Sequence, residues 1–149
     1  GARPDGGPWR VAFESPDALP GGRRIHRVVE LRDMAMATSG DYRNYYERDG
    51  RRFSHTIDPR TGRPIEHGLA SVTVLHAEAA WADAWATALN VLGPDEGYSL
   101  AASQGLAAYF IARAPEAAGD AGEPGFTVSM TAPFRPFLDE VVPSDPATH

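Results

Sequence analysis

The run of residues 81–92 constrains the fold of this chain more than any other segment. It reads Trp-Ala-Asp-Ala-Trp-Ala-Thr-Ala-Leu-Asn-Val-Leu. Wound as an α-helix at about 100° per residue, the run gathers an apolar stripe on one side. The stripe consists of Trp81, Trp85, Ala88 and Leu92. We therefore expect a helix from about residue 78 to residue 92, ended by the Gly93-Pro94 pair.

The side of this helix away from the stripe has an unusual composition. Asp83 and Thr87 lie one turn apart there. Most of the residues around them are small: Ala79, Ala80, Ala86 and Asn90. A helix face exposed to solvent usually carries Glu, Lys, Arg and Gln instead. Two oxygen ligands one turn apart suit a hard cation such as Mg²⁺, so Asp83 and Thr87 are candidate metal ligands.

Packing offers a second interpretation of the same helix face. Its alanines could lie directly against a neighbouring strand. The Asp83 carboxylate would then need a partner, because burying an unpaired charge is costly. The candidate partners are Arg43, Arg60 and Arg63. The metal interpretation has the advantage that it accounts for the carboxylate, the hydroxyl and the small neighbours together.

The rest of the sequence consists of strand patterns separated by turn signals. Strands are predicted at 9–13, 25–31, 34–38, 42–47, 51–55, 69–76, 107–112 and 126–131. Asp49-Gly50 lies between two of them and is typical of a hairpin turn. A second helix is expected at about 95–103. Strands before and after a helical pair indicate an α+β fold, with a largely antiparallel sheet and the helical pair packed on one side.

Length, charge and cysteine content narrow the class of protein. The 149 residues fit one domain. The net charge is −6 and all 14 basic residues are arginine, so no basic stripe is available to neutralise phosphates and we expect no nucleic-acid partner. No apolar run approaches the length of a membrane-spanning helix. Cysteine is absent, which excludes disulfides and thiolate metal sites.

Residues 54–62, which read Ser-His-Thr-Ile-Asp-Pro-Arg-Thr-Gly, form the second informative motif. His55 ends a predicted strand just before a turn, so its ring is expected at the rim of the sheet, where functional sites tend to lie. A histidine in this place could act as a general base or bind a cofactor near neutral pH. The alternative is a polar residue at a strand end, and the motif alone does not decide between the two.

Residues 38–41, which read Thr-Ser-Gly-Asp, form a third and weaker motif. We expect the strand before them to end in a turn at Ser39-Gly40. Such a turn can present backbone N–H groups to a phosphate or to the edge of a flavin. An ordinary turn between a strand and a hairpin explains the segment equally simply, and from these residues alone it is the better interpretation.

Together the three motifs resemble the FAD:protein FMN transferases, the ApbE family. The resemblance rests on Ala-Thr-Ser-Gly-Asp-Tyr (37–42), the 54–62 motif and Ala-Asp-Ala-Trp-Ala-Thr-Ala (82–88), in this order and spacing. It implies an enzyme that splits FAD, attaches FMN to a threonine of an acceptor protein and releases AMP, with Mg²⁺ required. The family's acceptors are subunits of flavin-carrying membrane redox complexes, and its members typically act on the periplasmic face of the inner membrane.

The resemblance also assigns roles to particular residues. It implies that Asp83 and Thr87 bind the metal and that His55 is the base for the attacking threonine. It further implies that Ser39, Gly40, His55 and Thr56 contact the flavin nucleotide. Two activities remain open beside the transferase: a Mg²⁺-dependent FAD pyrophosphatase, and a flavin-binding domain without catalysis.

The family's other half lies N-terminal to the matching region, and it carries a further metal-coordinating position and much of the flavin pocket. The chain begins at Gly1 without a methionine and enters a strand pattern almost at once. We therefore expect residues 1–132 to be the C-terminal part of an ApbE-like domain, an incomplete half of it. If the chain is a fragment, it carries half of the active site and should be inactive alone; if it is a genuine short chain, it must complete its site with a second chain or have lost the activity. Residues 133–149 contain several prolines and are expected to form an extended or disordered tail.

Overall fold

The computed structural model describes residues 1–14, 16, 25–40, 45–48, 51–114 and 125–138, with the backbone alone at 45–48 and 51–53. Contacts divide the chain into two units. One comprises Met34–Arg135, and the other comprises Gly1–Asp33 with Pro136–His149. Across the described part of the chain, no helix combines the length and the apolar character needed to cross a membrane.

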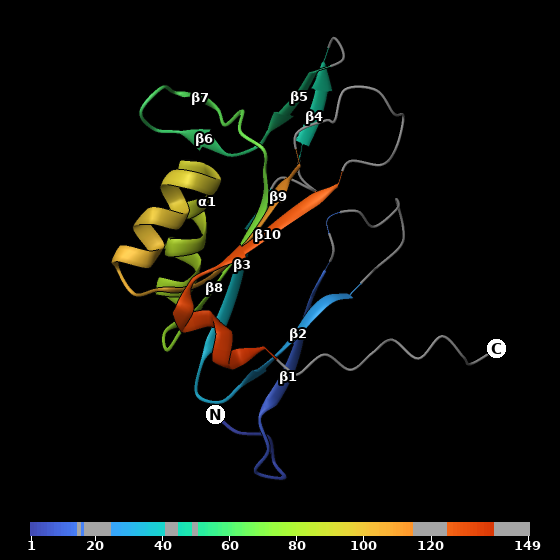
Figure 1. The fold of residues 1–149 in the computed structure, drawn as a ribbon, viewed down its shortest axis with the longest axis vertical. Coiled ribbons are helices and arrows are strands. Elements are labelled where there is room, and N and C mark those ends of the chain that lie inside the picture. Colours follow the sequence, from blue (N-terminus) through green and yellow to red (C-terminus); the bar gives the residue numbers. More distant parts are fainter. Residues whose placement is uncertain (15, 17–24, 41–44, 49–50, 115–124, 139–149) are drawn as a thin grey trace, which may run out of the picture. The chain divides into compact units, whose positions relative to one another are not determined.

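A four-stranded antiparallel sheet forms the frame of the larger unit (Figure 1). Its strands, in spatial order, are β10 (Phe126–Met130), β9 (Ala107–Arg113), β8 (Leu69–His76) and β3 (Ala35–Gly40). β8 is buried along its length except at its last residue, His76. A strand buried along its length is expected inside a sheet, and β8 lies between β3 and β9.

The helix α1 (Ala79–Ser103) packs against this sheet. It is interrupted at Gly93, which has φ 83° and ψ −175°, and Pro94 follows directly. The predicted break between two helical segments is therefore confirmed. The start is also as expected, since Glu78 is the N-cap residue and its N–H donates to His76 Nδ1 over 3.0 Å.

The apolar stripe is not the side of α1 that is buried most deeply. Ala82, Ala86 and Leu89 are fully buried against the sheet, whereas Trp81 of the predicted stripe remains 53% exposed. The reason is steric: alanines let the helix backbone lie close to the valines of β8, and an indole ring at the same place would hold the two elements apart. Trp85 lies partly buried at the margin of the core.

Two small hairpins connect β3 with β8. The first pairs β4 (Tyr45–Arg48) with β5 (Arg51–Ser54), as predicted, although the Asp49-Gly50 turn lies outside the described residues. The second pairs β6 (Ile57–Asp58) with β7 (Arg63–Pro64) around the turn at 59–62. This second hairpin holds the predicted Asp-Pro-Arg-Thr-Gly turn beside the end of the first segment of α1.

The smaller unit contains an antiparallel pair, β1 (Trp9–Glu14) and β2 (Ile25–Leu31). Val29 of β2 is fully buried and forms an isolated bridge with Leu138.

The expected extended tail is wrong for its first residues. A 3₁₀ helix, η1 (Ala132–Phe137), forms instead, and in the larger unit its Phe134 is fully buried against the ring of Tyr109. Burying an aromatic side chain offsets the entropy lost on ordering this segment. Residues 139–149 lie outside the described part of the chain, and the proposed boundary at 132 stays a prediction.

Candidate functional site

One side of α1 joins the three sequence motifs. Thr87 Oγ1 lies 3.2 Å from Ser39 Oγ of β3, within hydrogen-bond distance. One turn further along the helix, Asn90 Nδ2 donates to Thr56 Oγ1 over 3.4 Å. Asp83 lies one turn before Thr87 on the same helix. Residues that are 48 and 34 positions apart in the sequence are thus brought into contact.

The predicted turn at Ser39-Gly40 is wrong, because β3 continues through both residues and pairs Ser39 with Val72 and Gly40 with Ser71. Gly40 has a packing role in this pairing. A Cβ atom there would collide with the Ala70 carbonyl oxygen and lie 3.0 Å from Ser71 Cα. The glycine therefore lets β3 approach β8 closely, and Ser39 is held by a strand rather than by a mobile turn.

Asp83 is exposed and forms no ion pair with another described residue. Arg60, one of its candidate partners, is engaged elsewhere: it donates to the carboxylates of Asp58 and Glu96. Arg43, a second candidate, lies outside the described residues. Of the alanines named for this face, Ala86 packs on the sheet as the second interpretation expected, whereas Ala79 and Ala80 are exposed. No side chain among the described residues neutralises the Asp83 carboxylate.

The donor set beside Asp83 fits Mg²⁺ in its chemistry. Asp83 and Thr87 offer hard oxygen atoms, which this ion prefers. Within the part of the chain that is described, no three His, Asp or Glu side chains gather into a metal site. The two side chains could therefore supply only part of an octahedral shell.

His55 lies exposed between β5 and β6. The next residue is firmly held through its backbone: Thr56 N–H donates to Ser54 Oγ over 3.1 Å, and Thr56 C=O accepts from Ile65 N–H over 3.1 Å. Its side chain is held by Asn90. The segment that presents His55 is thus anchored on the side of α1 that carries Asp83 and Thr87.

Asp58 stabilises the turn that follows. Its carboxylate accepts from the backbone N–H of Arg60 over 2.8 Å and from the Arg60 guanidinium over 3.1 Å. These hydrogen bonds from Arg60 hold the pKa of Asp58 below its usual value. Arg60 also pairs with Glu96 of α1 over 3.2 Å, so the turn is tied to the second segment of the helix.

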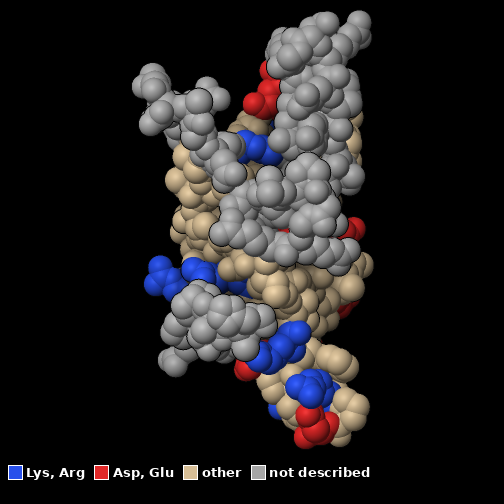
Figure 2. Space-filling view, turned by 90° about the vertical axis from the view of Figure 1, so that its right-hand side faces the viewer, with Lys and Arg blue, Asp and Glu red and all other residues tan. Residues whose placement is uncertain are grey.

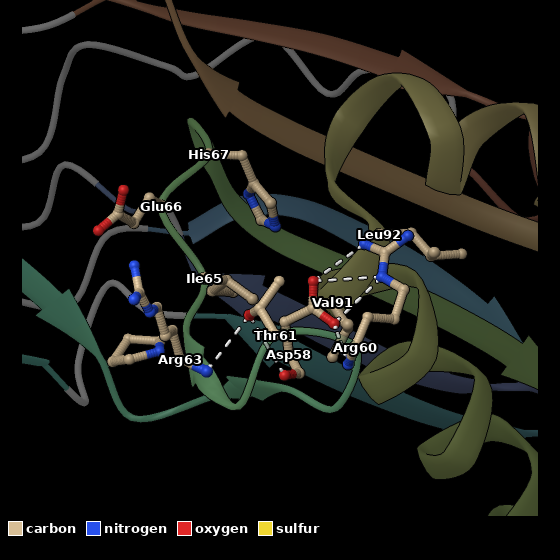
Figure 3. A pocket seen from close by; sticks show the side chains of 10 residues that line it. Asp58, Arg60, Thr61, Arg63, Ile65, Glu66, His67, Val91 and Leu92 are labelled. Carbon is tan, nitrogen blue, oxygen red and sulfur yellow. Dashed lines mark hydrogen bonds and ion pairs between the residues drawn. The ribbon is translucent and has the colours of Figure 1, made fainter.

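A pocket of about 500 Å³ lies between this turn and the end of the first segment of α1 (Figure 3). Its lining includes Asp58, Arg60, Arg63, His67 and Leu92. None of the side chains predicted as metal or flavin ligands lines it.

Sequence reasoning assigned no role to His67 or Asn90. His67 accepts from Leu69 N–H over 3.3 Å, and its ring lies against Gly93, whereas its buried Nε2 has no hydrogen-bond partner among the described residues. Asn90 is 1% exposed, and its buried Oδ1 likewise has no partner in the part of the chain that the structure describes. A polar residue between Leu89 and Val91 was a signal available in the sequence for Asn90. For His67 no comparable signal exists.

The charged side chains do not gather by sign on the face drawn in Figure 2. Arginine and acidic side chains lie next to one another among the described residues of that face.

Comparisons with known proteins identify the family of the chain. The ApbE family model matches residues 1–110. A FAD:protein FMN transferase of Escherichia coli (strain K12) is 45% identical over 138 residues, and one of Klebsiella pneumoniae is 44% identical over 138 residues. These matches cover 93% of this chain but only 36% and 37% of the relatives. The chain thus spans little more than a third of their length.

Solved structures give the same result. The flavinyl transferase ApbE of Pseudomonas stutzeri has a TM-score of 0.72 and 45% identity, over 95% of this chain and 40% of that protein. The flavin transferase ApbE of Vibrio cholerae has a TM-score of 0.73 and 38% identity, over 93% and 40%. The family model, the relatives and the shared α+β fold lead to one conclusion: this chain belongs to the ApbE family.

Proposed function

We propose that the protein containing this chain transfers FMN from FAD to a threonine of an acceptor flavoprotein subunit and releases AMP. The observation that carries the proposal is the contact of one side of α1 with both other motifs, through Thr87 and Asn90. The names of the relatives support flavin transfer. We further propose an acceptor in a flavin-carrying membrane redox complex, at the periplasmic face of the inner membrane, as the resemblance implies.

Asp83 and Thr87 are the proposed Mg²⁺ ligands. Asp83 suits this role because its carboxylate is exposed and unpaired among the described residues, in contrast to Asp58, which Arg60 already neutralises. When bound, Mg²⁺ would stabilise the negative charge that develops on the pyrophosphate and on the departing AMP.

His55 is the proposed general base, and Ser39, Gly40 and Thr56 are proposed to contact the flavin nucleotide. In the transfer, the acceptor threonine oxygen bonds to the phosphorus of the FMN half, and the bond from this phosphorus to the AMP oxygen breaks. The bonding electron pair leaves with AMP, and the threonine proton passes to the His55 ring. An exposed ring beside a firmly held Thr56 suits a reaction with a second protein.

The test uses the longest form of the protein that contains these 149 residues. Asp83→Asn and Thr87→Val should each lower the rate of flavin attachment by about 100-fold or more, the size expected for a lost charge-stabilising group. Covalent flavin fluorescence of the acceptor in a denaturing gel and AMP release measure the rate. Asp95→Asn removes an exposed carboxylate from the same helix and should keep the wild-type rate. Undiminished transfer by Asp83→Asn would contradict the metal assignment.

The same assay separates the two other activities. Release of AMP and free FMN without an acceptor would indicate a FAD pyrophosphatase. Tight FAD binding that does not depend on Mg²⁺ and gives no product would indicate a binding domain. Product formation only when the acceptor is present would support the transferase.

A further inference from the structure

Asn90 is a buried polar residue in an apolar part of α1. It is 1% exposed and lies between Leu89, which is fully buried, and Val91. Its Nδ2 donates to Thr56 Oγ1, and its Oδ1 is buried with no hydrogen-bond partner among the residues that the structure describes. A buried polar atom without a hydrogen bond destabilises a fold, so an apolar residue of similar size would favour stability at this position. The side-chain hydrogen bond to Thr56 is the feature that an apolar residue would lose.

The hydrogen bond from Asn90 sets the rotation of the Thr56 side chain, which the backbone hydrogen bonds of Thr56 do not fix. Thr56 N–H and C=O are already bonded to Ser54 and Ile65, so the rotation of the side chain remains to be set. Because its hydroxyl oxygen accepts from Asn90, its own proton points elsewhere. Among the described residues no acceptor for this proton is found.

We propose that Asn90 is a positioning residue that orients the Thr56 hydroxyl to donate a hydrogen bond to the bound flavin nucleotide. The inference rests on the proposed function, because that function places a flavin nucleotide beside Thr56. The placement of Asn90 supports it: Asn90 follows Thr87 by three positions on the helix, so the same side of α1 holds the proposed metal ligands and sets the Thr56 hydroxyl.

The decisive variants are Asn90→Leu and Thr56→Val, made in the longest form of the protein. Asn90→Leu should leave the unfolding temperature of the free protein unchanged or higher, because it removes the unpaired Oδ1. The same variant should weaken FAD binding and raise KM for FAD by about 2- to 10-fold, the size of one neutral hydrogen bond. KM for the acceptor should not change.

The double variant tests whether the two residues act through one hydrogen bond. If they do, Asn90→Leu combined with Thr56→Val should be no worse than Thr56→Val alone, because residues in one network are not additive. Thr56→Ser keeps the hydroxyl and should bind FAD nearly as the wild type does. Thr127→Val removes a threonine hydroxyl from β10 and serves as the matched control.

Several outcomes would overturn the proposal. Wild-type FAD affinity in Asn90→Leu would do so, as would effects of the two single variants that multiply in the double variant. If Asn90→Leu does not fold, Asn90→Ala gives the same comparison, since it also removes the N–H that reaches Thr56. Flavin fluorescence measures FAD affinity, so the proposed role of Asn90 can be tested even if no FMN transfer occurs. Absent transfer would instead count against the proposed function.

Discussion

At the scale of single residues, the Asp58 carboxylate holds its turn in place through Arg60. Hydrogen bonds from Arg60 lower the pKa of Asp58 from its usual 3.8. Ionised Asp58 therefore stabilises the fold above the unfolded-state pKa, and this contribution is lost as the pH falls through the lower folded-state pKa. We predict that Asp58→Asn lowers the unfolding temperature at pH 7, and that its difference from the wild type narrows below about pH 3.8.

Thermal unfolding at a series of pH values from 7 to about 3 checks this prediction. Asp95→Asn is the control, because Asp95 is exposed and forms no ion pair among the described residues. A difference between Asp58→Asn and the wild type that stays constant down to the lowest pH would show that the charge of Asp58 is not the cause.

At Gly40, the close approach of the neighbouring backbone leaves no room for a side chain. A methyl group at this position would collide with the Ala70 carbonyl oxygen, which is backbone and cannot rotate away. We predict that Gly40→Ala destabilises the protein by roughly 1–3 kcal/mol, as overpacking usually does. Denaturant unfolding measures the loss. Gly125→Ala is the control, because its new Cβ would lie 3.7 Å from its nearest neighbour, and it should change stability little.

At the scale of elements, the break in α1 depends on Gly93. Its φ of 83° with ψ of −175° is a conformation that residues with a Cβ rarely adopt, and a Cβ would lie 2.8 Å from His67 Cδ2. We predict that Gly93→Ala lowers stability by roughly 1–3 kcal/mol or more. Gly105→Ala, at φ 65° with open space around it, should cost less.

Removing the His67 ring separates steric collision from backbone strain at this break. In the His67→Ala background, Gly93→Ala should lose less stability than in the wild type, as a double-variant cycle of unfolding free energies would measure. Equal losses in both backgrounds would mean that backbone strain alone makes glycine necessary at position 93.

The strands could be predicted from sequence better than the side of the helix that is buried. Alternating and β-prone runs such as 69–76 act locally, so they identify β8 without knowledge of its neighbours. The buried side of α1 depends on what lies opposite. The large side chain of Trp81 in the apolar stripe stays exposed, whereas close contact with the sheet requires Ala82 and Ala86.

At the scale of the whole molecule, the motifs could be found in the sequence but their contacts could not. The spacing of Asp83 and Thr87 follows from helix geometry, which is local. The contact of Thr87 with Ser39 joins residues 48 positions apart and depends on how α1 packs on β3. The role of Asn90 depends on its contact with Thr56, and this contact cannot be inferred from the sequence alone.

The last prediction concerns the 149 residues as an isolated chain. On the side of α1 toward Ser39 and Thr56, Asp83 supplies one carboxylate and Thr87 supplies one hydroxyl. These two ligands do not complete the octahedral coordination that Mg²⁺ requires. We therefore expect this chain alone, mixed with FAD, Mg²⁺ and acceptor, to release no AMP above the rate without protein. The longest form of the protein should release it under the same conditions.

A thermal unfolding transition of the isolated chain is the necessary control, because an unfolded chain would be inactive for a trivial reason. The opposite result would be equally informative. AMP release by the folded chain, abolished by Asp83→Asn and retained by Asp95→Asn, would mean that these residues complete the metal shell with only FAD and water. The side of α1 that carries Asp83, Thr87 and Asn90 would then be sufficient as the protein's part of the metal site.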